Sequence, residues 1–287
     1  MPWRNGALLL LGLGATSLSL VPRLTASELK PRTASAFEHY VELTEARMKA
    51  ELAAPTQFLY LDTMSEEERN LEIDRIRSGQ IFVRQLATRD GGKRVEIPDG
   101  LAHHWVAIGF IPHVKLERVL ELAEDFDQHA EYFKPDLVKS QLLNRDGGHF
   151  HVYFRFRRHA IVTVEYSTQF DIDFTQLDSM HVYSVARAVR IAEVRNPGEK
   201  DEHELPVGND RGFLWRLNLY TRYEQADDGV YVQIEFLALS RSVPAIFAWL
   251  VNPYVKSVPR DYLTNYLHKL DEVVVHAAKP EAPEPKP

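Results

Sequence analysis

The feature that most constrains how this chain folds is a succession of strand-like segments in its second half. Each segment is bounded by turn signals and carries an alternating or continuous apolar pattern. The six segments are Leu137–Asn144, His149–Arg158, Ile161–Phe174, His181–Arg195, Gly212–Glu224 and Val230–Ser240. The connectors Arg145–Gly148 and Asp227–Gly229 have the composition of hairpin turns. Together they predict an antiparallel sheet.

A further strand and several helices flank these segments in the sequence. Leu101–Ile111 is a seventh strand, two helices follow at Lys115–Glu124 and Asp127–Phe133, and a long helix follows the last strand at Ala245–His276. A seven-stranded sheet is too large to leave one face bare, and the last helix is the only element long enough to cover it. We therefore predict an α+β fold in which a curved seven-stranded antiparallel sheet wraps around the C-terminal helix and leaves a cavity.

Three short stretches mark where strands and helices begin, and they carry a family resemblance. They are His104–Pro112, Asp125–His129 followed by Pro135–Val138, and Leu239–Pro244. With the order of elements, they make residues 101–275 resemble the helix-grip superfamily, which includes START lipid-transfer domains and polyketide cyclase-like proteins. The resemblance implies one cavity under the C-terminal helix for a hydrophobic ligand. It implies no particular chemistry, because this superfamily hosts carriers, sensors, cyclases and hydrolases.

The N-terminal third adds to this basic fold. Residues 36–53 and 65–77 have helical patterns and residues 80–88 a strand pattern. We therefore expect residues 27–100 to form a helical extension with one strand, and residues 101–276 to form the helix-grip ligand-binding domain.

Both ends of the chain are predicted to lie outside the fold. Residues 7–21 carry no charge, Arg4 is the only charge before them, and small residues follow. This pattern is typical of a signal peptide over residues 1–26, and it predicts a periplasmic or extracellular protein. The alternatives are an uncleaved segment that anchors the protein to a membrane, or a buried N-terminal helix. Four prolines among residues 279–287 predict a solvated, disordered tail over residues 277–287.

Composition excludes several classes of chemistry. The 287 residues include no cysteine, which rules out disulfides, a thiolate nucleophile and iron–sulfur clusters. A net charge of −7 argues against a general nucleic-acid binder. No Walker loop, dinucleotide fingerprint or nucleophile elbow occurs. His149 and His151 share one face of a strand, but no third ligand follows at a telling spacing, so we expect a solvent-facing stripe. No metal and no cofactor is expected.

One strand carries a row of small side chains on a single face. Ser184, Ala186 and Ala188 alternate along it, and Arg190 is next in the same row. Small side chains on an inner face leave room for a ligand, and an arginine among them can anchor a carboxylate or phosphate. The alternatives are that the row faces water, or that Arg190 pairs with an internal acid such as Glu235.

The remaining candidates depend on which face of the sheet each strand turns inward. Trp215 belongs to the mostly apolar row of its strand, while Tyr220 and Arg222 belong to the other row. Periodicity does not decide between the rows, because a shift of one residue reverses every side chain. Trp105 is either core or pocket wall, and Glu235 is either solvated or a cavity group. The candidate ligand-binding residues are Trp105, Arg190, Trp215, Tyr220, Arg222 and Glu235.

These patterns lead to three hypotheses about function. The first is non-catalytic binding or transport of a hydrophobic or amphipathic small molecule, lipid-like or polyketide-like, with no nucleic-acid partner. The second is a cyclase or aromatase that uses Glu235, Tyr220 and Arg190 inside the cavity. The third is an envelope interaction protein with a vestigial cavity, which predicts an exposed apolar patch over residues 36–77.

Overall fold

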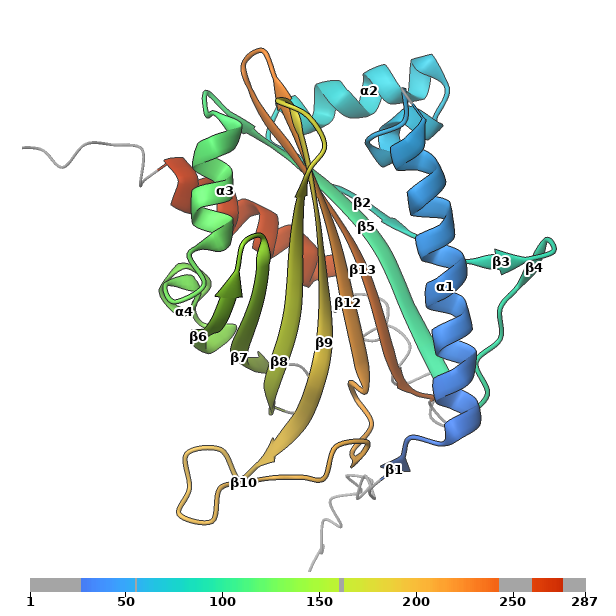
Figure 1. Ribbon diagram of the computed structural model, residues 1–287, viewed down its shortest axis with the longest axis vertical. Helices are drawn as coiled ribbons and strands as arrows, with labels where there is room; N and C mark the ends of the chain where they lie inside the picture. The colour runs from blue at the N-terminus through green and yellow to red at the C-terminus, as the bar shows by residue number, and fades with distance from the viewer. Residues whose placement is uncertain (1–26, 55, 160–162, 243–259, 276–287) are drawn as a thin grey trace, which may run out of the picture.

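The computed structural model describes residues 27–54, 56–159, 163–242 and 260–275 (Figure 1). The predicted signal peptide, the proline-rich tail and the first part of the predicted C-terminal helix lie outside these residues. Within them, no helix is long and apolar enough to cross a membrane.

A large antiparallel sheet forms the centre of the molecule. In the described part of the chain it has nine strands, and it includes all seven that the sequence predicts. The main path runs in the order β2 (Phe82–Gln85), β5 (Gly100–Pro112), β13 (Gly229–Arg241), β12 (Arg216–Ala226), β9 (His181–Arg195), β8 (Thr163–Gln176), β7 (His149–His159) and β6 (Leu137–Asp146). The ninth strand, β10 (His203–Glu204), pairs with β9.

In the described chain, two short antiparallel strand pairs are separate from this sheet. β3 (Arg89–Asp90) and β4 (Lys93–Arg94) form a hairpin that projects from the body of the molecule (Figure 1). β1 (Ser27–Glu28) pairs with β11 (Asn209–Asp210), so the start of the described chain is held beside the loop before β12.

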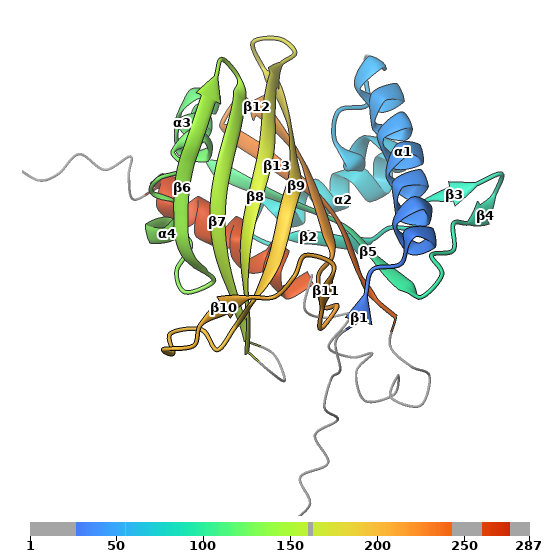
Figure 2. The same ribbon diagram turned by 60° about the horizontal axis from the view of Figure 1, so that its bottom comes forward.

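Helices cover the inner face of the curved sheet, as the helix-grip prediction requires. They are α3 (Leu116–Glu124), α4 (His129–Tyr132) and a C-terminal helix over residues 260–275 (Figure 2). The C-terminal helix buries one stripe, because its apolar residues recur at three- and four-residue intervals. That stripe, which packs on the inner face of the sheet, is Leu263, Leu267, Leu270 and Val274. The predicted sheet around a C-terminal helix is confirmed.

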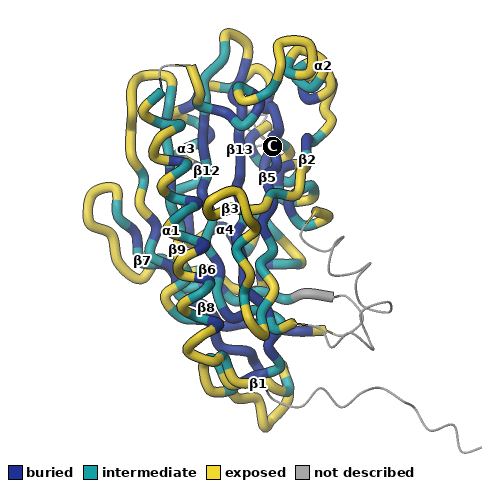
Figure 3. Tube along the Cα trace, turned by 90° about the vertical axis from the view of Figure 1, so that its right-hand side faces the viewer, coloured by how far each residue is buried: buried dark blue, intermediate teal, exposed yellow. Residues whose placement is uncertain are grey.

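A second helical layer covers the outer face. It consists of α1 (Pro31–Ala53), the 3-10 helix η1 (Tyr60–Thr63) and α2 (Glu66–Arg77). Figure 3 shows α1 lying over strands whose residues are buried. The buried side chains of α1 again recur at three- and four-residue spacing: Phe37, Tyr40, Thr44 and Met48. The part of the sheet around β5, β13 and β12 is therefore covered on both faces.

The interaction hypothesis predicts an exposed apolar patch over residues 36–77, and the structure does not contain one there. Among the described residues of that range, Leu71 is the only large hydrophobic side chain that is exposed. The apolar side of α1 is turned to the sheet instead, where it contacts a buried cluster that includes Leu237 and Leu239.

Candidate ligand-binding cavity

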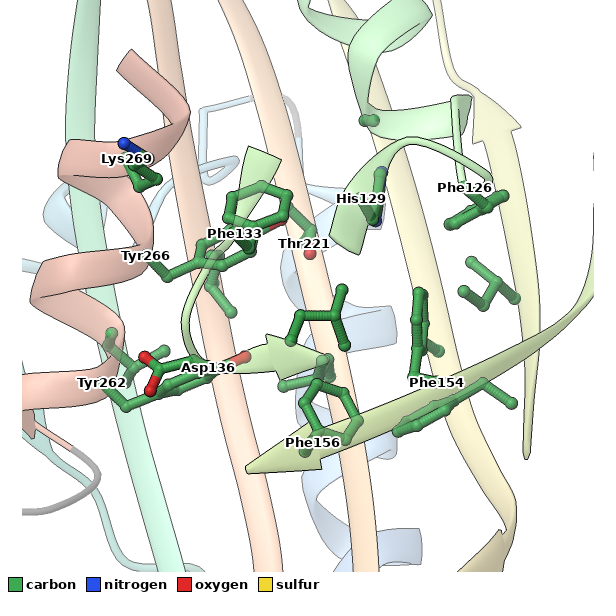
Figure 4. A pocket seen from close by; sticks show the side chains of 18 of the residues that line it. Phe126, His129, Phe133, Asp136, Phe154, Phe156, Thr221, Tyr262, Tyr266 and Lys269 are labelled. Atoms are coloured by element: carbon green, nitrogen blue, oxygen red, sulfur yellow. The ribbon is translucent and has the colours of Figure 1, made fainter. Parts of the chain in front are cut away.

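A cavity of about 260 Å³ lies between the inner face of the sheet, the segment around α4 and the C-terminal helix (Figure 4). Its walls come from the α3–β6 segment, from β7 and β8, from a floor formed by β9, β12 and β13, and from the C-terminal helix. The apolar lining residues are Ala123, Phe126, Phe133, Pro135, Leu137, Phe154, Phe156, Phe170, Ile172, Phe174, Ala186, Leu219, Ile234, Tyr262, Leu263 and Tyr266.

Aromatic rings form a large part of the wall. Phe154 and Phe156 lie on β7 at alternate positions, so both point to the inner face. The ring of Phe133 stacks on that of Tyr266, with centroids 4.6 Å apart. This stack joins the α4 segment to the C-terminal helix beside the cavity (Figure 4). Rings held in this way form a preshaped apolar surface.

His129 is the buried titratable group of the α4 wall. Its ring stacks on Phe154, and its Nε2 lies 3.1 Å from the backbone oxygen of Leu122, to which it donates. Burial lowers the pKa of His129 from 6.5 to about 4, against the opposing effects of that hydrogen bond and of Asp125. The ring is therefore neutral at pH 7.

The charged lining residues lie where the cavity meets solvent. The side chains of Lys134 and Lys269 are 61% and 42% exposed, and each pairs with a glutamate three residues away in the sequence. Asp136 and Asn265 also line this part of the wall. The cavity thus has a polar, solvent-exposed mouth and a mainly apolar interior.

None of the six candidate residues named from the sequence lines this cavity. Trp105 faces inward but is part of the core under the C-terminal helix. Trp215 and Tyr220 belong to the cluster beneath α1 on the outer face. Arg222 and Glu235 are on the outer face as well, where each pairs with a residue of α1.

Arg190 is turned away from the cavity by a β-bulge. Ser184 and Ala186 line the cavity, as the row of small side chains predicts. The register with β8 then shifts, because Phe170 is opposite Ala188 while Gln169 is opposite Arg190. The extra residue, Val189, reverses the side on which the next residue points. Arg190 therefore leaves the row and pairs with Glu204 on β10.

Glu235 is buried rather than solvated, because α1 covers the outer face. Its Oε1 accepts a hydrogen bond from His104 Nε2 at 2.6 Å and another from Arg47. Burial acts to raise the pKa of Glu235, but the hydrogen bond from His104 and the charges of Arg47 and Arg222 outweigh it and hold that pKa below its usual value. Glu235 is therefore ionised and paired.

The other polar candidates belong to the same interface. Arg222 donates to Glu51 at 2.7 Å and to the backbone oxygen of Phe58 at 2.6 Å. Tyr220 donates to Glu45 at 2.8 Å. These contacts hold α1 on the sheet. The cyclase hypothesis requires Tyr220, Glu235 and Arg190 to converge on one point inside the cavity. They do not converge there, because Tyr220 and Glu235 lie outside the cavity and Arg190 pairs with Glu204.

The two histidines on β7 are partly exposed to solvent, and each pairs with an aspartate on the neighbouring strand. His149 pairs with Asp173 at 2.8 Å and His151 with Asp171 at 2.7 Å, on the neighbouring strand β8. Within the described ranges, no cluster of three or more histidine, aspartate or glutamate side chains is placed to hold a metal ion.

The cavity residues of the α4 segment are not among the candidates named from the sequence. Phe126, His129 and Phe133 lie at three- and four-residue spacing, next to a strand that alternates phenylalanines. An aromatic cluster of this kind, facing a row of small side chains on another strand, is the signal that indicates this pocket.

No family model and no curated protein matches the sequence. The structure is similar to that of a STAR-related lipid transfer protein from Xanthomonas axonopodis (16% identity, 67% of this chain and 98% of that chain, TM-score 0.43). It is also similar to human STARD10 (8% identity, 78% and 83%, TM-score 0.43). A third similar structure is the Zhui aromatase/cyclase from Streptomyces sp. R1128 (11% identity, 63% and 95%, TM-score 0.41). The helix-grip assignment rests on this chain's own sheet order and C-terminal helix.

Proposed function

We propose that the protein binds a compact hydrophobic molecule in the inner cavity and acts as a carrier or sensor rather than an enzyme. The observation that carries this proposal is the cavity itself, which combines a volume of about 260 Å³ with walls that are mainly apolar and rich in aromatic rings. Burial of apolar ligand surface contributes about 25 cal/mol per Å², which is the driving force for binding. The buried histidine in the wall is neutral and hydrogen-bonded to the backbone.

The volume supports a small ligand. Pockets for drug-sized molecules measure about 300–1,000 Å³, and a dry cavity of about 150 Å³ accepts benzene. A cavity of about 260 Å³ therefore suits a molecule of two or three fused rings, or a short acyl chain. A lipid with two long chains exceeds this volume.

The direct test is titration of the full chain with N-phenyl-1-naphthylamine, a neutral probe whose fluorescence rises in apolar surroundings. The informative variant is Ala186→Phe, because Ala186 lines the cavity and a phenyl ring there fills it. The matched control is Val189→Phe, three residues along the same strand, where the side chain is 54% exposed. We expect one site per chain, at least tenfold weaker binding in Ala186→Phe, and unchanged binding in Val189→Phe. Equal binding by all three proteins would place the probe elsewhere and overturn the proposal.

Export is a separate part of the proposal. The uncharged run over residues 7–21 supports a protein that meets its ligand in the periplasm or outside the cell, and membrane attachment through that segment is the alternative. The test is the mass of the protein recovered from its native cells. A chain that lacks about 26 residues in a soluble fraction supports export with cleavage, whereas a full-length chain in the membrane fraction supports the anchor.

A further inference from the structure

Three hydroxyl groups lie together on the floor of the cavity. Ser184 on β9 is directly opposite Thr221 on β12, and Tyr223 is two residues further along β12 on the same face. All three line the cavity, and Ser184 and Tyr223 are only 5% and 6% exposed. They are a polar group within an otherwise apolar floor that includes Leu219 and Ile234.

The hydroxyls interact with one another. Burial raises the pKa of Tyr223, and the nearby hydroxyls of Ser184 and Thr221 offset part of this effect. Tyr223 is therefore a neutral phenol at every physiological pH. The hydroxyl of Tyr223 has hydrogen-bond partners in the side chains of Ser184 and Thr221. Each of the three groups both donates and accepts hydrogen bonds.

A buried polar group that faces an apolar space without a full set of partners costs free energy. Each hydroxyl can take part in more than one hydrogen bond, so a ligand oxygen placed between the three groups can bond to them as well. Among the described residues that line the cavity, none places a positive charge at this subsite, since Lys134 and Lys269 lie at the mouth and His129 is neutral. A carboxylate buried on this floor would lose its hydration without gaining a counter-ion, which is strongly unfavourable.

We infer that Ser184, Thr221 and Tyr223 form a hydroxyl subsite for one uncharged oxygen of the ligand, a ketone, ester or hydroxyl. The inference rests on the proposed function and deepens it. The ligand class becomes a compact ring compound with a neutral oxygen directed at the sheet, as opposed to a pure hydrocarbon or a fatty acid bound by a buried carboxylate.

The test uses three probes that share one ring system: naphthalene, 2-naphthol and 2-naphthoate, each titrated into the full chain at pH 7. One net hydrogen bond is worth about tenfold in affinity. We expect 2-naphthol to bind about tenfold more tightly than naphthalene, and 2-naphthoate to bind more weakly than either.

Variants assign the preference to the subsite. Thr221→Val is nearly isosteric and removes one hydroxyl, and Ser184→Ala and Tyr223→Phe remove the other two. Thr175→Val is the matched control, because Thr175 is an exposed residue on the neighbouring strand β8. We expect each subsite variant to reduce 2-naphthol binding several-fold while naphthalene binding, which also reports a folded cavity, stays unchanged.

The outcomes separate the two proposals. Equal affinities for naphthalene and 2-naphthol, or a preference that survives all three subsite variants, overturn the subsite and leave the cavity proposal standing. Failure of every probe to bind overturns the cavity proposal and the subsite with it. Tightest binding by 2-naphthoate overturns the assignment of a neutral ligand.

Discussion

The Nε2 atom of His104 lies 2.6 Å from Oε1 of Glu235, although the two side chains are only 2% and 1% exposed. On its other side, Nδ1 of His104 lies 3.0 Å from the hydroxyl of Tyr40 on α1. The pair therefore links the centre of the sheet to the helix that covers its outer face. It supports the architecture from the side opposite the cavity.

Replacing Glu235 with glutamine tests this role. The variant leaves the guanidinium of Arg47 without one of its two carboxylate partners at a buried interface. Loss of one member of a buried pair typically costs about 3–5 kcal/mol, and the conservative amide places the expected loss in unfolding free energy at about 3 kcal/mol. Urea denaturation measures it. The control is Glu204→Gln, whose half-exposed pair with Arg190 is worth less than about 1 kcal/mol; equal losses in the two variants contradict the account.

Acid weakens the same interface. The folded-state pKa of Glu235 is lowered, so its contribution to stability is present above its ordinary carboxyl pKa and is lost as the pH falls through the folded value. We expect the wild-type unfolding free energy to fall below about pH 4.5 more steeply than that of Glu235→Gln. Parallel pH profiles would show that Glu235 makes no such contribution.

His129 gives stability a second pH dependence, at higher pH. Its pKa is lowered from 6.5 to about 4, so its contribution is fully present above pH 6.5 and is lost as the pH falls toward 4. The full effect corresponds to about 3 kcal/mol. Burial also lowers the pKa of His103 from 6.5 to about 4, so His103 adds a similar contribution to the pH dependence of stability. Between pH 7 and pH 4.5 we therefore expect His129→Gln to lose less stability than the wild type does, which denaturation at the two pH values measures. If the wild type and His129→Gln lost the same unfolding free energy between the two pH values, His129 would not be held neutral by folding.

The outer-face residues are expected to leave ligand binding unchanged. Tyr220→Phe removes the hydrogen bond to Glu45 and lowers the unfolding free energy by about 1 kcal/mol. Because Tyr220 faces away from the cavity, the affinity of the Tyr220→Phe protein for N-phenyl-1-naphthylamine stays within twofold of that of the wild type. A large loss of affinity in a folded Tyr220→Phe protein would show that Tyr220 contributes to ligand binding, which contradicts its placement on the outer face.

The strands and most helices are predictable from the sequence because local chemistry marks their ends. Ser65 caps α2 by accepting from the Glu68 amide at 3.4 Å, and glycine at position 229 follows the turn into β13. The predicted start of α1 at residue 36 is late, because Pro31 occupies the first turn, where its missing amide hydrogen costs nothing.

The directions of the side chains were not predictable in the same way. β13 is covered on both faces, so Ile234 and Leu237 are both buried although they point to opposite sides. Its pattern therefore lacks the contrast that tells inside from outside. The burial of Glu235 depends on α1, which is about 190 residues away in the chain (Arg47 is its partner at a separation of 188). The reversal of Arg190 depends on a single bulge that periodicity does not reveal.

The most direct test of the central claim is to locate a bound probe by nuclear magnetic resonance. Intermolecular nuclear Overhauser effects are measured between N-phenyl-1-naphthylamine and the protein's methyl groups. We predict contacts with the cavity methyls of Ile172, Leu219 and Leu263, and none with those of Leu237 and Leu239 on the outer face. Contacts with Leu237 and Leu239 alone, or no contacts at saturating probe, would contradict binding in the inner cavity.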